Sequence, residues 1–378
     1  MRISRISKIN TGNRIFYNPN SEQKKCFYKI KEELEQKYAI TLSNRDFIIK
    51  QLISTLTHGD YINHNMPNID LVITRSDIKN FYPSINKHML YKKLKQSNII
   101  SQYSFTNLQS MFFSKSVKGV PLGLPFSSVL AEIYLEQFDS DINHFFNPTF
   151  YFRYVDDIII INYDTMIGIK NEDISSKLTT IFRQNNLLIN TKKTKISNFN
   201  KRENLNFDFL GYNFKTINHK LLISISDDKF LKIVNNIKYY FYLFKKSSKN
   251  ERQFWLLYYR LINTIYGVTS TNKNNKKIRF GLGYSYNLVN DSNQIDLLIS
   301  IIKGLIHSCS LNSKRRSTLF YILSTKDTPL EILNKRLDYT KLTNTQLSKI
   351  KYRLGIRTSS NNISRIFFRL YKGINHKK

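Results

Sequence analysis

Residues 150–161 have the sequence FYFRYVDDIIII, which places two acidic side chains between two apolar runs. Aromatic and β-branched residues make up these runs, and they predict two strands, Phe150–Tyr154 and Ile158–Ile161. The connection is short, so we expect the strands to pair as a β-hairpin with Asp156 and Asp157 at its tip. Taken alone, so short a pattern is equally compatible with turn residues or with salt-bridge partners of basic side chains.

A second strand is expected to bring a third carboxylate to the same place. The β-branched run 71–77, with the sequence LVITRSD, ends in Asp77. If the hairpin pairs beside this strand in one antiparallel sheet, the three acids converge, and like charges so close raise one another's pKa. Divalent cations remove that cost, and carboxylate oxygens are ligands that Mg²⁺ prefers.

The acidic cluster therefore predicts a site for two Mg²⁺ ions, with Mn²⁺ as a substitute. Two metal ions about 3.5–4 Å apart can activate an attacking oxygen and stabilise a leaving one in phosphoryl transfer. Adjacent strand residues point to opposite faces, so Asp156 and Asp157 are not equivalent. We assign Asp156 as the main ligand beside Asp77 and Asp157 as a secondary one. The backbone carbonyl of Ile78 is a further candidate ligand.

The composition indicates a polyanion-binding protein with a sizeable core. The 378 residues include 59 Lys and Arg against 27 Asp and Glu, a formal net charge of +32, and 41% are hydrophobic. Such a charge favours nucleic acid as a partner, with an anionic membrane surface as the second candidate. Cys26 and Cys309 lack CxxC spacing, which argues against zinc ribbons, iron–sulfur sites and disulfide frameworks. This cysteine usage fits a reducing cytoplasm, where we expect the protein. No apolar run reaches the ~18 residues of a membrane span, and we expect no membrane partner.

The chain changes character near residue 225. Helical and strand patterns alternate before it, and helical patterns dominate after it. Gly- and Asn-rich residues 269–286 are expected to be a connection. Further strands are expected over 189–199 and 206–214, and helices over 22–38, 45–56, 86–95, 127–145, 170–186, 229–246, 251–265, 295–308 and 343–354.

Serines stand where three of these helices are expected to begin, as N-cap residues. Ser43 precedes the helix from residue 45, Ser84 precedes the one from residue 86, and Ser127 or Ser128 begins the long helix after it. Apolar residues recur every third or fourth position of the long helix and predict its buried face, namely Leu130, Ile133, Phe138, Ile142 and Phe145.

Five motifs over about residues 70–215 resemble those of reverse transcriptases, in the family's order. Residues 153–157 (RYVDD) resemble the central hairpin, and residues 77–85 (DIKNFYPSI) resemble the first catalytic motif of retron, group II intron and related bacterial enzymes. Residues 119–123 (GVPLG) with Ser128 resemble the nucleotide-contacting loop and helix. Residues 190–194 (NTKKT) resemble the next motif, and residues 209–212 (FLGY) resemble the primer-grip hairpin. Each motif alone is weak, but their conjunction is specific.

The resemblance assigns roles to individual residues. In reverse transcriptases an aromatic at the position of Tyr82 sits under the sugar and excludes a ribose 2′-OH, while its neighbour Phe81 would point into the core. Lys193 resembles the lysine proposed to protonate the pyrophosphate leaving group. The plainer interpretations are a core aromatic at Tyr82 and a solvated cation at Lys193. Nucleotide contacts are implied at Phe81, Tyr82, Pro121, Leu122 and Gly123, and a primer grip at Leu210, Gly211 and Tyr212.

Two positions distinguish this chain within the resemblance. Leu122 stands where most relatives carry Gln, so an amide that would contact nucleotide or template is missing. Glu132 stands where group II introns tend to have Asn, and it would either pair with a cation or lie exposed on its helix. Together with residues 266–270 and 281–286, this helix resembles the unknown-group and abortive-infection reverse transcriptases of bacterial antiphage defence. The size resembles the smaller polymerase of two-polymerase defence systems.

The resemblance implies an α+β fold, the right-hand polymerase. Residues 1–225 would form fingers and palm, with helices on one face of an antiparallel palm sheet, and residues 226–378 an α-helical thumb-like domain. The implied activity is that of an RNA-directed DNA polymerase that adds dNTPs to a 3′ end, with Asp77, Asp156, Asp157 and Lys193 as catalytic residues. The implied partners are an RNA template or non-coding RNA, the DNA product, and a second polymerase subunit or further copies of the chain.

Other functions stay open on the sequence. One is an RNA-dependent RNA polymerase or a template-independent terminal polymerase on the same fold, and Tyr82 argues against the use of ribonucleotides. Another is a catalytically silent RNA-binding subunit of a defence complex, against which the intact acidic set argues. The primer also stays open, because a nucleic-acid end, a 2′-OH or the hydroxyl of one of the 24 tyrosines could serve.

Overall fold

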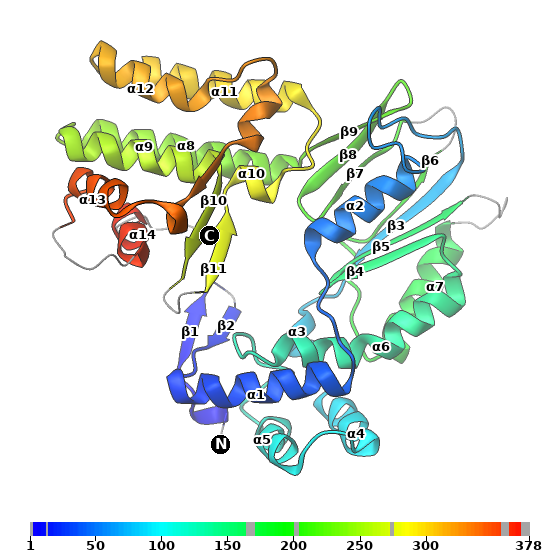
Figure 1. Cartoon of the computed structure of the whole chain (residues 1–378). Helices are drawn as coiled ribbons and strands as arrows, with labels where there is room; N and C mark the ends of the chain where they lie inside the picture. The colour runs from blue at the N-terminus through cyan, green and yellow to red at the C-terminus, as the bar shows by residue number, and fades with distance from the viewer. Residues whose placement is uncertain are drawn as a thin grey trace. The chain divides into compact units, whose positions relative to one another are not determined.

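The structure of the chain, a computed structural model, describes residues 3–12, 14–163, 171–199, 204–272, 276–356 and 363–371 (Figure 1). Lys170, the first residue of one expected helix, lies outside these ranges. The chain divides into two compact units, Met1–Asn204 and Leu205–Lys378. No helix in the described ranges is long and apolar enough to cross a membrane.

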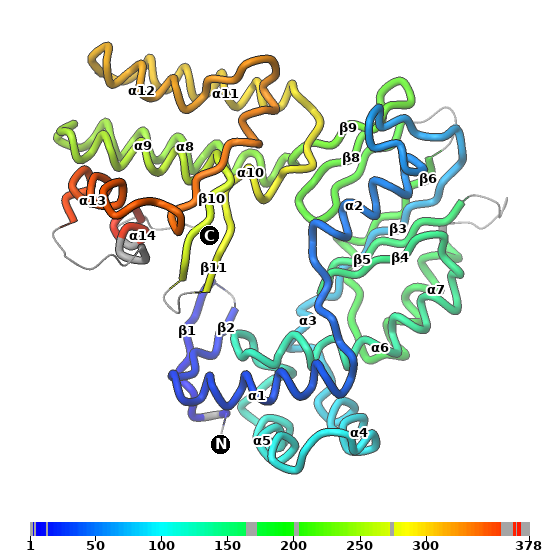
Figure 2. Tube along the Cα trace, viewed as in Figure 1, coloured from blue at the N-terminus to red at the C-terminus, as the bar shows by residue number. Residues whose placement is uncertain are grey.

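A four-stranded antiparallel sheet organises the first unit, in the order β4-β5-β3-β6 (Figure 2). The predicted hairpin and the predicted strand before it are confirmed, and they lie side by side. Strand β6 is shorter than expected because residues 191–193 form a turn. The strands are β3 (Leu71–Asp77), β4 (Phe150–Tyr154), β5 (Asp157–Tyr163) and β6 (Lys195–Phe199).

The other elements of the first unit are a small hairpin, a 3₁₀ turn and seven helices in the described ranges. The hairpin joins β1 (Lys8–Thr11) and β2 (Arg14–Tyr17), and the 3₁₀ turn covers Ile3–Arg5. The helices are α1 (Ser21–Lys37), α2 (Arg45–Leu56), α3 (Phe81–Ser84), α4 (Lys87–Ser97), α5 (Gln102–Phe112), α6 (Ser127–Phe146) and α7 (Asn171–Gln184).

Helices cover both faces of the four-stranded sheet, which corrects the expectation of one covered face. Ile158 and Ile160 of β5 pack into one core with residues of α6 and α7. Ile159 and Ile161 are buried too, on the opposite face because strand residues alternate. There α2 lies against β4 (Figure 1), and Phe47 of α2 packs on Phe152 of β4 with a ring-centroid distance of 6.4 Å. Four consecutive buried isoleucines, without alternation, are typical of a strand covered on both sides.

The helix starts correct the expected N-caps. Asn44 caps α2 through its side chain, and Asn86 caps α4, in place of Ser43 and Ser84. In both cases the residue directly before the helix is an asparagine, and its side-chain oxygen accepts from backbone N–H groups of the first turn. Helix α6 begins without a side-chain cap, and its first serine, Ser127, donates its hydroxyl to the Pro121 carbonyl at 2.5 Å.

The buried face of α6 is confirmed except at its end. Leu130, Ile133, Phe138 and Ile142 are buried, but Phe145 is 48% exposed. It lies in the last turn of the helix, two residues before the left-handed C-cap residue Asn147. Side-chain periodicity shows which face of a helix is apolar, but it does not show where the sheet beneath that face ends.

The second unit combines a three-stranded meander, a second small sheet and helices. The expected strand over 206–214 is interrupted at Leu210 and Gly211, so it forms two strands of the antiparallel meander β7-β8-β9. The expected connection over 269–286 instead forms a hairpin and a short helix, because residues 269–271 continue a strand from Val268 that pairs with residues 277–280. A third strand joins this hairpin in parallel.

Short strands and mostly longer helices make up the second unit, as far as the structure describes it. The strands are β7 (Asn206–Phe209), β8 (Tyr212–Ile217), β9 (Lys220–Ile225), β10 (Gly267–Thr271), β11 (Lys277–Phe280) and β12 (Arg336–Asp338). The helices are α8 (Asp227–Lys246), α9 (Glu251–Ile265), α10 (Leu282–Ser285), α11 (Ser292–His307), α12 (Ser313–Leu323), α13 (Asn344–Arg353) and α14 (Ile363–Tyr371), with 3₁₀ turns at Pro329–Asn334 and Tyr339–Lys341.

Candidate active site

Strand pairing brings the three predicted aspartates together. Asp77 ends β3 and Asp157 begins β5, and the two are direct partners in the antiparallel register, so their side chains lie on the same face of the sheet. Asp156 occupies the tip of the hairpin, and its backbone carbonyl accepts a hydrogen bond from the Ile78 N–H at 3.1 Å. The end of β3 is therefore tied to the hairpin tip through both its register and its backbone.

The Asp77 carboxylate is held by the motif at residues 190–194. Asp77 is 4% exposed. Its Oδ1 accepts from the Asn190 side chain at 2.8 Å, and its Oδ2 accepts from the Lys193 ammonium at 2.6 Å. The Asp77 carbonyl also accepts from the Asn190 N–H at 2.9 Å. Lys192 and Lys195 lie close to Lys193 in the sequence. The hydrogen bond to Asp77 is made by Lys193, whose side chain is 62% exposed.

The electrostatics of the cluster are those of crowded negative charge. Burial, followed by the charges of Asp156 and Asp77, raises the pKa of Asp157 to about 6. Burial and the Asp77 charge likewise raise the pKa of Asp156. The hydrogen bond to Asp77 raises the pKa of Lys193. The positive charges that act on Asp156 and Asp157, those of Lys193, Arg14 and Arg75, therefore do not offset the burial and the mutual repulsion of the carboxylates.

The donor chemistry of this cluster fits hard divalent cations. Asp77 and Asp157 on two adjacent strands and Asp156 at the hairpin tip supply carboxylate oxygens, the donor type that Mg²⁺ prefers. Their mutual repulsion is the cost that a divalent cation would remove. Within the described ranges, no three acidic, His or Cys side chains are already arranged to hold a metal ion. Asp77 instead has its oxygens on Asn190 and Lys193.

Replacing Asp157 tests this repulsion directly. The raised pKa means that ionisation of Asp157 destabilises the folded state, so stability falls as pH rises from about 4 to about 6. We expect Asp157→Asn to increase the free energy of unfolding by about 1–3 kcal/mol at pH 7.5 in metal-free buffer. Urea unfolding at pH 7.5 and pH 4 measures the effect, with exposed Glu172→Gln as control. A stabilisation that is equal at both pH values would show that charge repulsion is not its cause.

Short helix α3 places Tyr82 at the edge of the acidic cluster. Burial, followed by the charges of Glu132 and Asp156, raises the pKa of Tyr82 to about 12. Phe81 is buried in the core, as expected. The Tyr82 carbonyl accepts from the Val120 N–H at 2.9 Å. The motif after Asp77 is thereby bonded to the loop that begins at Gly119.

The loop at residues 119–123 is held on its other side by β2. Its carbonyl at Leu122 accepts from the Tyr17 N–H at 2.8 Å. Gly123 has a φ of +92°, and a side chain there would meet the Tyr17 carbonyl oxygen at 2.5 Å. Pro121 is buried. The predicted nucleotide-contacting loop is thus bonded on one side to Tyr82 of α3 and on the other side to Tyr17 of β2.

The residues assigned to the primer grip lie in the second unit. Leu210 and Gly211 form the turn between β7 and β8, with φ values of +48° and +82°. Tyr212 is fully buried, and its hydroxyl donates to the Ser285 carbonyl at 3.1 Å. Gly211 therefore has the backbone conformation that favours glycine. The assignment of these residues to a primer grip stays a prediction.

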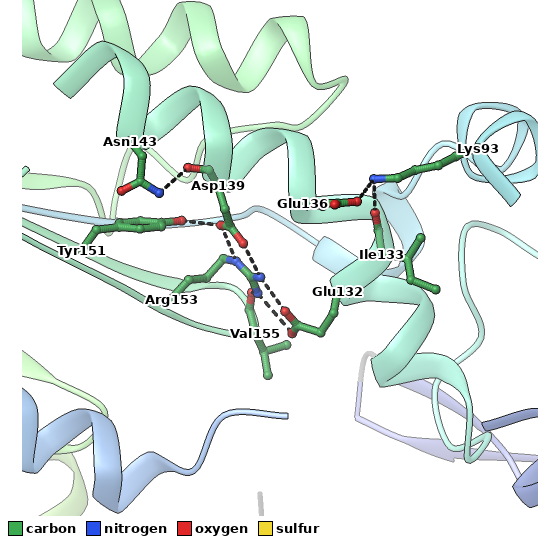
Figure 3. Close-up of polar contacts among 9 residues, drawn as sticks. All are labelled: Lys93, Glu132, Ile133, Glu136, Asp139, Asn143, Tyr151, Arg153 and Val155. Atoms are coloured by element: carbon green, nitrogen blue, oxygen red, sulfur yellow. Dashed lines mark hydrogen bonds and ion pairs between the residues drawn. The ribbon is translucent and has the colours of Figure 1, made fainter. Parts of the chain in front are cut away.

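Sequence reasoning missed three contributors to the site. Asn190 lies inside one of the five motifs, but its bond to Asp77 has no signal in the sequence. Arg14 of β2 lowers the pKa of Asp156 through its charge. Nothing in the sequence distinguishes Arg14 from the other basic residues, of which there are 59 in all. Arg153 stands beside the acidic pair in sequence, and the structure buries it against Glu132, which confirms that Glu132 pairs with a cation (Figure 3).

Comparison with known proteins gives matches of two kinds. Structures of telomerase from Candida albicans and Candida tropicalis, each in complex with a TWJ fragment of telomeric RNA, are similar at 14% and 13% identity with TM-scores of 0.39 and 0.41. They cover 94% and 97% of this chain, which spans 54% and 63% of theirs. A truncated apo telomerase from Candida tropicalis has 16% identity and a TM-score of 0.37, with 55% of this chain and 45% of that chain covered. No curated protein sequence matches the chain.

The second kind of match is a protein family. The sequence model of the reverse transcriptase (RNA-dependent DNA polymerase) family matches residues 14–214, which is more than half of the chain. The matched range begins at β2, includes Asp77, the hairpin and Lys193, and ends in β8. With its mixed helices and antiparallel sheets, the fold agrees with the α+β polymerase fold that the motifs imply. The chain belongs to the reverse transcriptase family.

Proposed function

We propose that the chain is an active RNA-directed DNA polymerase that adds deoxynucleoside triphosphates to a 3′ end. The observation that carries this proposal is the register between Asp77 and Asp157, with Asp156 at the adjoining hairpin tip. Asp77, Asp156 and Asp157 would hold two Mg²⁺ ions, with a contribution from the Ile78 carbonyl. Bound there, the ions supply charge neutralisation and activation of the attacking oxygen for in-line phosphoryl transfer.

Lys193 is proposed to give a proton to the leaving group. In the reaction the primer 3′ hydroxyl loses its proton to solvent, its oxygen bonds to the α-phosphorus of the nucleotide, and the bond from that phosphorus to pyrophosphate breaks. The Lys193 ammonium lies at the cluster, and its side chain is mostly exposed, so it can turn towards an incoming triphosphate. Its raised pKa keeps it protonated in the resting protein. The proton would pass to the pyrophosphate oxygen.

The template is proposed to be RNA, and the role to be bacterial antiphage defence. The net charge of +32 supports binding to a polyanion through its phosphates. The defence role follows from the resemblance of the α6 helix and the later segments to defence-associated reverse transcriptases. A dedicated non-coding RNA in the cytoplasm would be the partner, with a second polymerase subunit or further copies of the chain in the assembly.

Feeding the purified protein one class of nucleotide at a time tests the proposal. We expect incorporation of labelled dNTPs with Mg²⁺ or Mn²⁺ and a primed RNA template, and little incorporation of NTPs. Product made without any RNA would instead identify a terminal transferase. Label incorporated from NTPs alone would refute the deoxynucleotide assignment. An inert protein that binds RNA and still protects cells would identify the silent RNA-binding subunit.

Tyr82 provides a sharper prediction about sugar selection. Tyr82→Ala removes the ring beside the acidic cluster. We therefore expect the ratio of kcat/KM for ribonucleotides to kcat/KM for deoxynucleotides to rise about tenfold or more. Tyr82→Phe keeps the ring and should keep the selectivity. Single-nucleotide extension gives kcat/KM for dATP and ATP with each variant. Unchanged selectivity in Tyr82→Ala would mean that Tyr82 is an ordinary core aromatic.

A further inference from the structure

Arg153 of β4 makes a dense set of contacts directly behind the hairpin tip. Its side chain is 6% exposed. It donates to Asp139 from Nε at 2.8 Å and from Nη2 at 2.7 Å, and to Glu132 from Nη1 at 3.2 Å and from Nη2 at 2.5 Å (Figure 3). Burial lowers the pKa of Arg153, but the bonds to Asp139 and Glu132 outweigh it and raise the pKa overall. The guanidinium is therefore a fixed charge, held by two carboxylates of α6.

A further contact of this guanidinium reaches the hairpin tip itself. Nη1 of Arg153 donates to the backbone carbonyl of Val155 at 3.1 Å. Val155 has a φ of +60°, a left-handed conformation that a β-branched residue rarely adopts. Because Tyr154 pairs with Asp157, Val155 is the first residue of a two-residue hairpin loop, where glycine usually supplies the positive φ. Such a conformation persists when surrounding contacts hold it in place.

We propose that Arg153 is a positioning residue, which fixes the strained Val155 turn to α6 and thereby keeps Asp156 and Asp157 aligned with Asp77. The two ends of the tip are then held by separate groups. Arg153 holds the Val155 carbonyl, and the Ile78 N–H holds the Asp156 carbonyl. The inference rests on the proposed function for its effect on catalysis, whereas its effect on the hairpin is independent of any activity.

Two side chains of β4 hydrogen-bond to carboxylates of α6. Asp139 also accepts from the Tyr151 hydroxyl at 2.5 Å, so a second β4 side chain is tied to the same carboxylate. The planar guanidinium bonds both carboxylates at once, which a lysine ammonium at that position cannot reproduce. Arg153→Lys therefore keeps the charge and most of the volume but loses the fork that reaches Val155.

A double-mutant cycle between Arg153 and Val155 tests the proposal. The four proteins are wild type, Arg153→Lys, Val155→Gly and the double variant. Glycine adopts a positive φ without strain, so the turn should depend less on Arg153 once Val155→Gly is present. We expect Arg153→Lys to lower kcat for dNTP addition by about 10–100-fold, with little change in RNA affinity or in the KM for dNTP. The loss should be several-fold smaller in the double variant than additivity predicts.

Two further measurements separate this role from simple stabilisation. Glu136 lies on α6, like Glu132 and Asp139, and its ion pair with Lys93 of α4 has an N–O distance of 2.7 Å and does not touch the hairpin (Figure 3). Glu136→Gln breaks this ion pair. It should leave kcat near wild type. Hydrogen–deuterium exchange of peptides covering residues 150–161 should be faster in Arg153→Lys, with the melting temperature close to that of wild type.

Each outcome decides a different claim. If wild type shows no nucleotide addition, the proposed function fails, and faster exchange at the hairpin alone upholds the positioning role. If Arg153→Lys lowers kcat and the loss is fully additive with Val155→Gly, or if exchange at 150–161 is unchanged, the positioning role is wrong. Faster exchange and kcat loss only in proportion to a fall in melting temperature would make Arg153 a general structural residue and would overturn the inference.

Discussion

Asp156→Ala is expected to abolish nucleotide addition, lowering it on the order of 10³-fold or more, while RNA binding stays close to wild type. Asp156 lies at the hairpin tip beside Asp77, and its side chain is proposed to hold the metal ions that neutralise the reacting phosphates. Its raised pKa shows that its charge is a cost in the metal-free fold, so the variant should be no less stable than wild type. Primer extension, RNA binding by filter retention and thermal unfolding measure the three quantities.

The matched control for this variant is an acidic residue away from the cluster. Glu172→Ala removes an exposed carboxylate in the first turn of α7 and should retain full activity. Equal nucleotide addition by wild type and Asp156→Ala would remove the basis of the proposed chemistry. A loss of addition that is accompanied by unfolding would call for Asp156→Asn, which keeps the side-chain volume.

Gly119→Ala is expected to destabilise the protein by about 2–4 kcal/mol and to disturb nucleotide binding. Gly119 has a φ of +55°, and an added Cβ would overlap the backbone carbonyls of Tyr82 and Pro83. Since the neighbouring Val120 N–H bonds the Tyr82 carbonyl at 2.9 Å, the strain falls on the turn that carries Tyr82. We expect a raised KM for dNTP and weaker discrimination against NTPs.

Gly59→Ala separates the cost of the positive φ from the cost of the steric overlap. Gly59 has a φ of +87°, but an added Cβ there meets nothing within 4 Å. It should cost only about 1–2 kcal/mol and leave the KM for dNTP unchanged. Urea unfolding of both variants and single-nucleotide kinetics give the comparison. Equal losses of unfolding free energy in Gly119→Ala and Gly59→Ala would show that the overlap with the Tyr82 carbonyl does not contribute to the destabilisation.

Local patterns predicted the parts of the site that depend on neighbours in sequence. The run 71–77 and the FYFRYVDDIIII hairpin are confirmed as strands, because β-branched and aromatic residues bounded by a tight turn favour pairing. The α+β polymerase fold and the reverse transcriptase family are likewise confirmed. The pairing of Glu132 with a cation was one of two interpretations, and Arg153 proves to be the partner.

Other expectations were wrong where the answer depended on distant residues. Residues 269–286 look like a polar connection, yet β10 pairs there with both β11 and β12, the latter about 70 residues further along the chain. Phe145 continues the apolar stripe of α6 but is exposed. The N-caps are a local exception: they are Asn44 and Asn86, one and two residues after the expected Ser43 and Ser84, because the exact first residue of a helix is not fixed by the sequence pattern.

The amino-acid sequence alone established the hairpin, its acidic tip and the order of the motifs, because turn chemistry and side-chain alternation act over a few residues. The folded molecule established which groups surround the acids. Lys193 and Asn190 reach Asp77 across more than a hundred residues, and Arg153 bonds two carboxylates one helix away. The chain has 59 basic residues, and only packing decides that Lys193 and Arg153 are among those that meet carboxylates, since long-range contacts form when the elements that carry them are brought together.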